Sequence, residues 1–223
     1  MKELVISLLL FLSLQAQALT FDSDVPKDIQ NQMKEDLALI NSVTGQGQTP
    51  LHKEIYSSLS GAAYQKFFES RIISVGLDEC GGGGAVACVQ PMIDAHKMWL
   101  SSNFAKYDTI QIDRIDIIYH EARHSEAKNG FWQHANCPVP FLDENGQDIR
   151  GSKSGIKLEG LPACDSSPYG SYGSSTIMMK NLVKYCTNCS EKLKMDAQLL
   201  VDEMMLRMYI PSVKKQMNDD FKL

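Results

Sequence analysis

Apolar side chains recur at helical spacing in four segments of the chain, which indicates helices with one buried face. Two of these segments begin at a proline. Asp24 lies two residues before Pro26 and Thr49 lies directly before Pro50, so we predict one helix after Pro26 and a shorter one after Pro50. The other two predicted helices cover residues 108–126 and 190–209. The last helix has an apolar stripe that we interpret as facing the core: Leu193, Ala197, Leu200, Met204 and Met208.

Other segments favour strands or irregular structure. Residues 64–77 and 85–89 are rich in aromatic and β-branched side chains, and with residues 98–100 they are predicted to be strands. Four consecutive glycines at 81–84 separate the first two, and we interpret them as a hairpin tip. Residues 129–172 are dominated by Gly, Pro, Asn, Asp and Ser, so we expect a long irregular segment that is functional or cross-linked.

The amino-terminal segment has the pattern of an export signal. An apolar run at residues 4–14 precedes Gln15-Ala16-Gln17-Ala18, and a run of this length ending in Ala-x-Ala is typical of a signal peptide. We therefore predict a signal peptide at residues 1–18 and one domain at residues 19–223, located outside the cell or in the periplasm.

Composition narrows the range of partners. Of the 223 residues, 43% are hydrophobic and 22% are charged, which is ordinary for one globular domain. The formal net charge is -5 and there is no basic run, so nucleic acid is a poor candidate partner. No segment reaches the roughly 18 to 20 apolar residues of a membrane span, so we expect none after signal removal.

All six cysteines lie after the predicted cleavage point. An even number of cysteines in an exported chain indicates disulfides, although sequence alone allows about 15 sets of pairings. Closure between sequence neighbours favours the pairs Cys80–Cys88, Cys137–Cys164 and Cys186–Cys189. We interpret the last pair, spaced C-x-x-C, as a structural disulfide, because no second pair or thioredoxin-like pattern accompanies it.

One short motif carries recognisable chemistry. His120-Glu121-Ala122-Arg123-His124 has the pattern H-E-x-x-H on the third predicted helix. Residues four apart on a helix lie about 6 Å apart along its axis and about 40° apart around it, so both imidazoles can reach one ion. Glu121 then lies beside the metal, where it can take a proton from a bound water.

Residues 117–125 resemble the active-site helix of the zincin metallopeptidases. The resemblance implies an α+β fold, in which a small mixed twisted sheet packs on the motif helix and a further helix follows near the C-terminus. It also implies one zinc ion bound by His120 and His124, Glu121 as the general base, and a peptide or protein substrate.

A catalytic zinc site needs a third protein ligand. The metzincin pattern would place a glycine at 127 and a histidine at 130, where this chain has Ala127 and Gly130. We therefore choose His134, the next histidine along the chain. A turn at Gly130 would bring it back over the helix, and a Cys137–Cys164 bridge would hold it there.

Alternatives for this ligand remain open. Asp165 lies in a segment similar to the aspzincin element, and it would also matter as a hydrogen-bond partner that orients a ligating histidine. Glu191 and Glu203 lie on the predicted C-terminal helix, where a gluzincin would supply a glutamate. Tyr169 and Tyr172 either stabilise an oxyanion or simply pack a glycine-rich loop.

Two functions are consistent with these patterns. The first is an exported zinc-dependent hydrolase, most simply a metallopeptidase. The second is a disulfide-bonded domain whose metal is structural, with a cysteine or another histidine closing the coordination. Arg123 and Glu126 are charged where the zincins carry uncharged or apolar residues, and this departure favours the second function.

Overall fold

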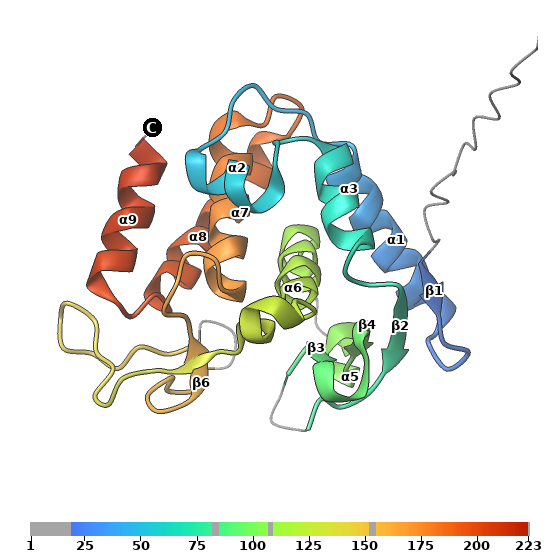
Figure 1. Ribbon diagram of the computed structural model, residues 1–223, viewed down its shortest axis with the longest axis horizontal. Coiled ribbons are helices and arrows are strands. Elements are labelled where there is room, and N and C mark those ends of the chain that lie inside the picture. Colours follow the sequence, from blue (N-terminus) through green and yellow to red (C-terminus); the bar gives the residue numbers. More distant parts are fainter. Residues whose placement is uncertain (1–18, 82–84, 107–108, 152–154, 223) are drawn as a thin grey trace, which may run out of the picture.

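The computed structural model describes residues 19–81, 85–106, 109–151 and 155–222. The predicted signal peptide, residues 1–18, and the glycines at 82–84 lie outside the described residues. The chain folds as an α+β protein with one small mixed sheet and several helices (Figure 1). This confirms the predicted α+β class.

Helices make up most of the described chain. In order they are α1 (Lys27–Asn41), α2 (Pro50–Tyr56), α3 (Gly61–Glu69), α4 (Pro91–Asp94), α5 (Ser102–Lys106), α6 (Gln111–Arg123), the 3-10 helix η1 (Ala127–Trp132), α7 (Ser171–Tyr185), α8 (Glu191–Leu206) and α9 (Pro211–Lys222). Helices α1, α2, α6 and α8 confirm the four helices predicted from apolar spacing.

The larger sheet has the strand order β1-β2-β4-β3. Its strands are β1 (Thr20–Phe21), β2 (Ser74–Leu77), β3 (Ala87–Gln90) and β4 (Ala95–Leu100). The first three in that order run parallel, and β3 pairs antiparallel with β4 at the edge. The hairpin predicted between residues 64–77 and 85–89 is therefore wrong. Strand β4 lies between them because its final residues, including Met98 and Leu100, are fully buried, as suits a central strand.

Residues 64–73 were wrongly predicted to be strand, because β2 begins only at Ser74. Residues 64–69 belong to α3, which begins where the Ser60 side chain accepts a hydrogen bond from the Ala63 N–H at 3.3 Å. Tyr64, Phe67 and Phe68 are buried at a spacing of three and four residues, so their periodicity is helical although their residue types favour strands.

Sequence periodicity also missed α7 and α9. Helix α7 is buried around most of its surface, so polar and apolar positions do not alternate along it. Helix α9 starts at Pro211, just after the predicted helix of residues 190–209, because proline suits the first turn of a helix.

Helix α6 lies between the two halves of the molecule. The sheet with α1 and α3 lies on one side of it, and α7, α8 and α9 lie on the other (Figure 1). Its residues Ile115, Ile118 and Ala122 are almost fully buried in the main core. This packing fixes the helix that carries the H-E-x-x-H motif between the two halves.

Three disulfides confirm the predicted pairings: Cys80–Cys88, Cys137–Cys164 and Cys186–Cys189. The second lies within the irregular segment, where it joins a small separate core with Phe141, Ile149 and Leu158. It also cross-links a short second sheet, in which β5 (Ala135–Asn136) pairs with β6 (Pro162–Cys164). In the parts of the chain that are described, no helix is both long and apolar enough to cross a membrane.

Candidate metal centre

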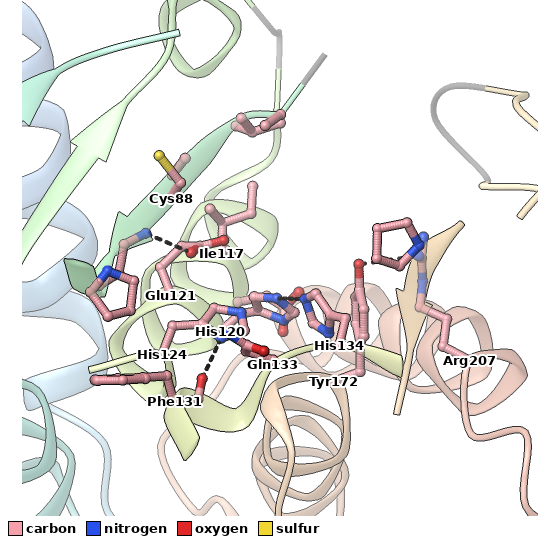
Figure 2. Close-up of a pocket in the computed structure, with 17 residues that line it drawn as sticks. Cys88, Ile117, His120, Glu121, His124, Phe131, Gln133, His134, Tyr172 and Arg207 are labelled. Atoms are coloured by element: carbon pink, nitrogen blue, oxygen red, sulfur yellow. Dashed lines mark hydrogen bonds between the residues drawn. The ribbon is translucent and has the colours of Figure 1, made fainter. Parts of the chain in front are cut away.

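Three histidines meet at the end of α6. His120 and His124 come from one face of the helix, and His134 comes from the segment after η1 (Figure 2). One ring nitrogen from each lies within 4.8 Å of the other two, and the Nε2 atoms of His120 and His134 are 3.1 Å apart. Two nitrogens bound to one tetrahedral zinc ion lie about 3.3 Å apart. The group has the donors and the dimensions to hold a metal ion.

The chain reaches His134 through a tight reversal in η1. Gly130, Phe131 and Trp132 follow one another with positive φ angles of 63°, 59° and 46°. Glycine adopts this conformation freely, but it is strained for the two aromatic residues. The predicted turn at Gly130 is therefore present, and it continues for two more residues.

Hydrogen bonds at Nδ1 orient two of the rings. His124 Nδ1 lies 2.8 Å from the Phe131 carbonyl oxygen, and His134 Nδ1 lies 3.1 Å from Oδ1 of Asp165. Each acceptor favours the tautomer with a proton on Nδ1, which leaves the lone pair on Nε2. These are the partners expected behind metal-binding imidazoles.

Asp165 therefore lies behind His134, outside the group of three. Its other oxygen, Oδ2, accepts backbone hydrogen bonds from Tyr172 at 2.8 Å and Gly173 at 3.2 Å, in the first turn of α7. Gly170 permits this approach, because a Cβ atom there would lie 2.3 Å from Oδ2. The buried carboxylate thus joins the start of α7 to the histidine group.

The first two histidines are held in the neutral form. Burial, and then the neighbouring imidazoles, place the pKa of His120 well below its usual value. Burial lowers the pKa of His124 to about 4, with His134 adding to the effect. Neutral imidazoles keep the lone pair that a metal ion requires.

Glu121 points from α6 towards the edge of the sheet. Its Oε2 accepts a hydrogen bond from the Val89 N–H on β3 at 3.2 Å. Burial raises the pKa of this carboxyl group to about 8, although the Val89 hydrogen bond opposes the shift. This buried carboxyl group with a raised pKa lines the same cavity as the three imidazoles, and perturbed groups of this kind cluster at active sites.

An open cavity of about 730 Å³ covers the group. Strand β3, α6, the start of α7 and the end of α8 line it, so both halves of the molecule contribute. Tyr172 lies on the far side of the histidines from Glu121, and its ring stacks on His134 with centroids 4.6 Å apart (Figure 2). Burial raises the pKa of Tyr172 to about 12, so its hydroxyl remains a hydrogen-bond donor.

Arg207 holds that tyrosine. Its Nη1 donates to the Tyr172 hydroxyl oxygen at 3.1 Å and to the Ala163 carbonyl oxygen at 3.3 Å. Its Nη2 pairs with Glu203 at 3.4 Å. Since the hydroxyl oxygen accepts from Arg207, its own proton is free to point elsewhere, including into the cavity.

The remaining candidates lie elsewhere. Glu191 is on an exposed part of α8, 3.5 Å from Lys194, and Glu203 pairs with Arg207. The Tyr169 hydroxyl donates to the Glu54 carboxylate on α2, so this tyrosine does not line the cavity.

One side of the histidine group is open to the cavity. All six cysteines are in disulfides, so none is available as a thiolate ligand. Among the described residues, no fourth His, Cys, Asp or Glu belongs to the group. An ion held by His120, His124 and His134 would keep a coordination position facing the cavity.

Sequence reasoning missed Arg207 and the backbone groups of Val89 and Phe131. A single arginine at the end of a helix matches no motif, and backbone groups leave no trace in residue type.

Comparison with protein-family models finds no family that matches this chain, and comparison with curated proteins finds no match.

Proposed function

We propose that this protein is a zinc-dependent hydrolase, most simply a metallopeptidase with a zincin-like arrangement. The observation that carries the proposal is one arrangement of side chains. Three imidazoles from His120, His124 and His134 converge, and they line the same open cavity as Glu121.

Zinc is the metal that this donor set favours. Three imidazoles and one open position are the ligands of many catalytic zinc sites, whereas calcium and magnesium prefer oxygen donors. When bound, zinc would supply a Lewis acid that polarises a carbonyl group and lowers the pKa of water.

Glu121 is proposed as the general base. Its carboxylate would accept a proton from the attacking water and pass it to the leaving amine. The Val89 hydrogen bond holds the side chain beside the cavity and favours the charged carboxylate form. Burial opposes this by raising the pKa of Glu121 to about 8, and the positive charge of a bound zinc ion would lower that pKa again, which favours the form that accepts protons.

Tyr172 is proposed to bind the oxygen that becomes negative during the reaction. It lies across the histidine group from Glu121, so the two side chains would act on opposite sides of the substrate. Arg207 keeps the hydroxyl oxygen in place as an acceptor, which directs the proton to another partner. A prearranged donor of this kind contributes mainly in the transition state.

The edge of β3 supports an extended peptide as substrate. Ala87 and Val89 line the cavity, and the Val89 N–H points to Glu121 instead of into the sheet. An extended chain beside such an edge can form main-chain hydrogen bonds with it. Export is part of the proposal and rests on the pattern of residues 1–18 and on the three disulfides, which suit an oxidising compartment.

The first experiment measures zinc in the oxidised, mature chain. We expect one zinc ion per wild-type chain and its loss in His124→Ala and His134→Ala. The surface variant His96→Ala is the control, because that ring bonds to the Arg71 carbonyl oxygen outside the group. A wild-type chain without zinc would overturn the proposal.

The second experiment separates catalysis from metal binding. With unfolded casein as the probe, new amino termini are counted for the wild type and for Glu121→Gln. We expect the variant to keep its zinc and to lose about 10²- to 10⁴-fold of the rate. Equal rates would refute Glu121 as the base. Failure of a hydroxamate to bind the zinc-loaded wild type would instead favour a closed, structural metal.

A further inference from the structure

The carboxylate of Glu126 accepts hydrogen bonds from four different side chains. It lies just after the motif helix with only 8% of its surface exposed. Its Oε1 accepts from Arg71 and Arg123, and its Oε2 accepts from Asn129 and Trp132, both at 2.7 Å. Both carboxylate oxygens are therefore fully engaged.

These donors come from three separate parts of the chain. Arg71 precedes β2, Arg123 is in the last turn of α6, and Asn129 and Trp132 are in η1. The Glu126 carbonyl oxygen adds two bonds to η1, because it accepts from the N–H groups of Asn129 and Phe131, both at 3.0 Å. One residue thus ties the motif helix and the sheet side of the molecule to the reversal that follows.

That reversal requires support. Phe131 and Trp132 both have left-handed backbone conformations, which persist only where the surroundings hold them. The main-chain carbonyl oxygen of Glu126 accepts from the Phe131 N–H, and its carboxylate accepts from the indole N–H of Trp132. Without these bonds the strained turn would relax towards ordinary backbone angles.

The same turn orients two of the three imidazoles. The Phe131 carbonyl oxygen is the partner of His124 Nδ1, and His134 follows Trp132 by two residues. A shift of the turn would therefore move one ligand and rotate another. Loss of about 1 Å of alignment is enough to weaken a metal or catalytic site substantially.

We propose that Glu126 is a positioning residue, which sets the affinity of the metal centre by holding the turn between its second and third histidines. The inference rests on the proposed metal binding and goes beyond it. It also accounts for the two charged residues that depart from the zincin pattern. Arg123 and Glu126 are buried partners of one another, and Arg123 in addition donates to the Tyr169 carbonyl oxygen at 2.9 Å.

The test is the zinc dissociation constant, measured by competition with a chelator. We expect Glu126→Gln to weaken zinc binding at least tenfold. Asp148→Asn is the matched control and should bind as the wild type does. That carboxylate also pairs with two basic residues, Arg150 and Lys157, but in the exposed part of the irregular segment.

A double-mutant cycle distinguishes positioning from a general loss of stability. The His134→Ala background is titrated at zinc concentrations high enough to measure the weak site that His120 and His124 leave. There the turn no longer delivers a third ligand, so adding Glu126→Gln should weaken binding much less than it does in the wild type. An equal loss in both backgrounds would overturn the inference.

Trp132→Phe keeps the test decisive if Glu126→Gln fails to fold. It removes one donor to Glu126 and leaves both arginine pairs in place, and we expect it to weaken zinc binding severalfold. Wild-type affinity in this variant, or in a folded Glu126→Gln, would overturn the inference while leaving the proposed function intact. A wild-type chain that binds no zinc would overturn both.

Discussion

Replacing Asp165 with asparagine removes one charge and one acceptor without changing the size of the side chain. In the native protein Oδ1 faces His134 Nδ1, and Oδ2 accepts from the N–H groups of Tyr172 and Gly173. Every neighbour of the carboxylate in these contacts is a donor. An asparagine offers one acceptor and one donor, so one of its two ends must face the wrong kind of group.

Both orientations of the amide have a cost. If the amide nitrogen faces α7, it meets two N–H donors and leaves them without an acceptor in a site where Asp165 is only 3% exposed. If it faces His134, it favours the tautomer with the proton on Nε2. That proton would then occupy the nitrogen that lies 3.1 Å from His120 Nε2, where a metal requires a lone pair.

The expected losses of zinc affinity and of unfolding free energy follow from these two sets of hydrogen bonds. Loss of a hydrogen-bond partner behind a ligating histidine typically weakens metal binding about 10- to 100-fold, or about 1.4–2.7 kcal/mol. Leaving buried donors unsatisfied costs the metal-free protein about 1–3 kcal/mol of unfolding free energy. We therefore expect Asp165→Asn to bind zinc about 10- to 100-fold more weakly if its amide nitrogen faces His134, and to unfold at lower urea concentration if that nitrogen faces α7.

The assay is chelator competition for zinc, with urea unfolding of the metal-free protein measured in parallel. Asp148→Asn makes the same chemical change at a more exposed carboxylate and should alter neither quantity much. Wild-type zinc affinity together with an unchanged urea midpoint in Asp165→Asn would refute the contacts assigned to this carboxylate.

Three further predictions test other parts of the structure. Tyr172→Phe keeps the ring stacked on His134 but removes the hydroxyl, so kcat should fall about 10²- to 10³-fold with zinc content unchanged; an unaltered kcat would exclude the proposed oxyanion role. Gly170→Ala places a Cβ atom 2.3 Å from Asp165 Oδ2, so we expect a lower urea midpoint for unfolding and would abandon this packing argument if the midpoint stayed the same. Burial lowers the pKa of His52 to about 3 in the folded protein. Between pH of about 6.5 and 3 the unfolded chain therefore binds a proton at His52 that the folded chain does not. The free energy of unfolding should fall as the pH falls through this range, by at most about 1.4 kcal/mol per pH unit. Urea unfolding across this range should show a shallower dependence in His52→Gln, and an identical dependence would show that other groups cause it.

Local patterns were enough to predict several parts of the protein. Apolar spacing and capping residues predicted α1, α2, α6 and α8, because each has one buried face and a local signal near its start or end. The cysteines were paired correctly by proximity in sequence. The H-E-x-x-H spacing placed two histidines on one face of a helix, since four residues make about one turn.

The choice of His134 as third ligand rested on Gly130 as a turn residue and on the assumption that this turn brings the chain back over the helix. Gly130 marked a turn, but the sequence contained no sign that Phe131 and Trp132 would continue it in strained conformations. The sequence left Asp165 open as an alternative ligand or as a hydrogen-bond partner of a histidine, and in the structure it lies behind His134 as such a partner. The exposed contacts of Glu191 and the orientation of Tyr169 likewise depended on which elements pack beside them.

Tertiary structure alone decided the strand order, the presence of α7 and the walls of the cavity. Helix α7 is buried nearly all round, so it has no polar face to create a helical period. Arg207 meets Tyr172, and Glu126 meets Arg71, across 35 and 55 residues of sequence. Periodicity and motifs report contacts within one or two turns of a helix. Contacts between distant segments are selected by the packing of the whole chain, so the sequence determined the motif and its helix, and only the fold determined what surrounds them.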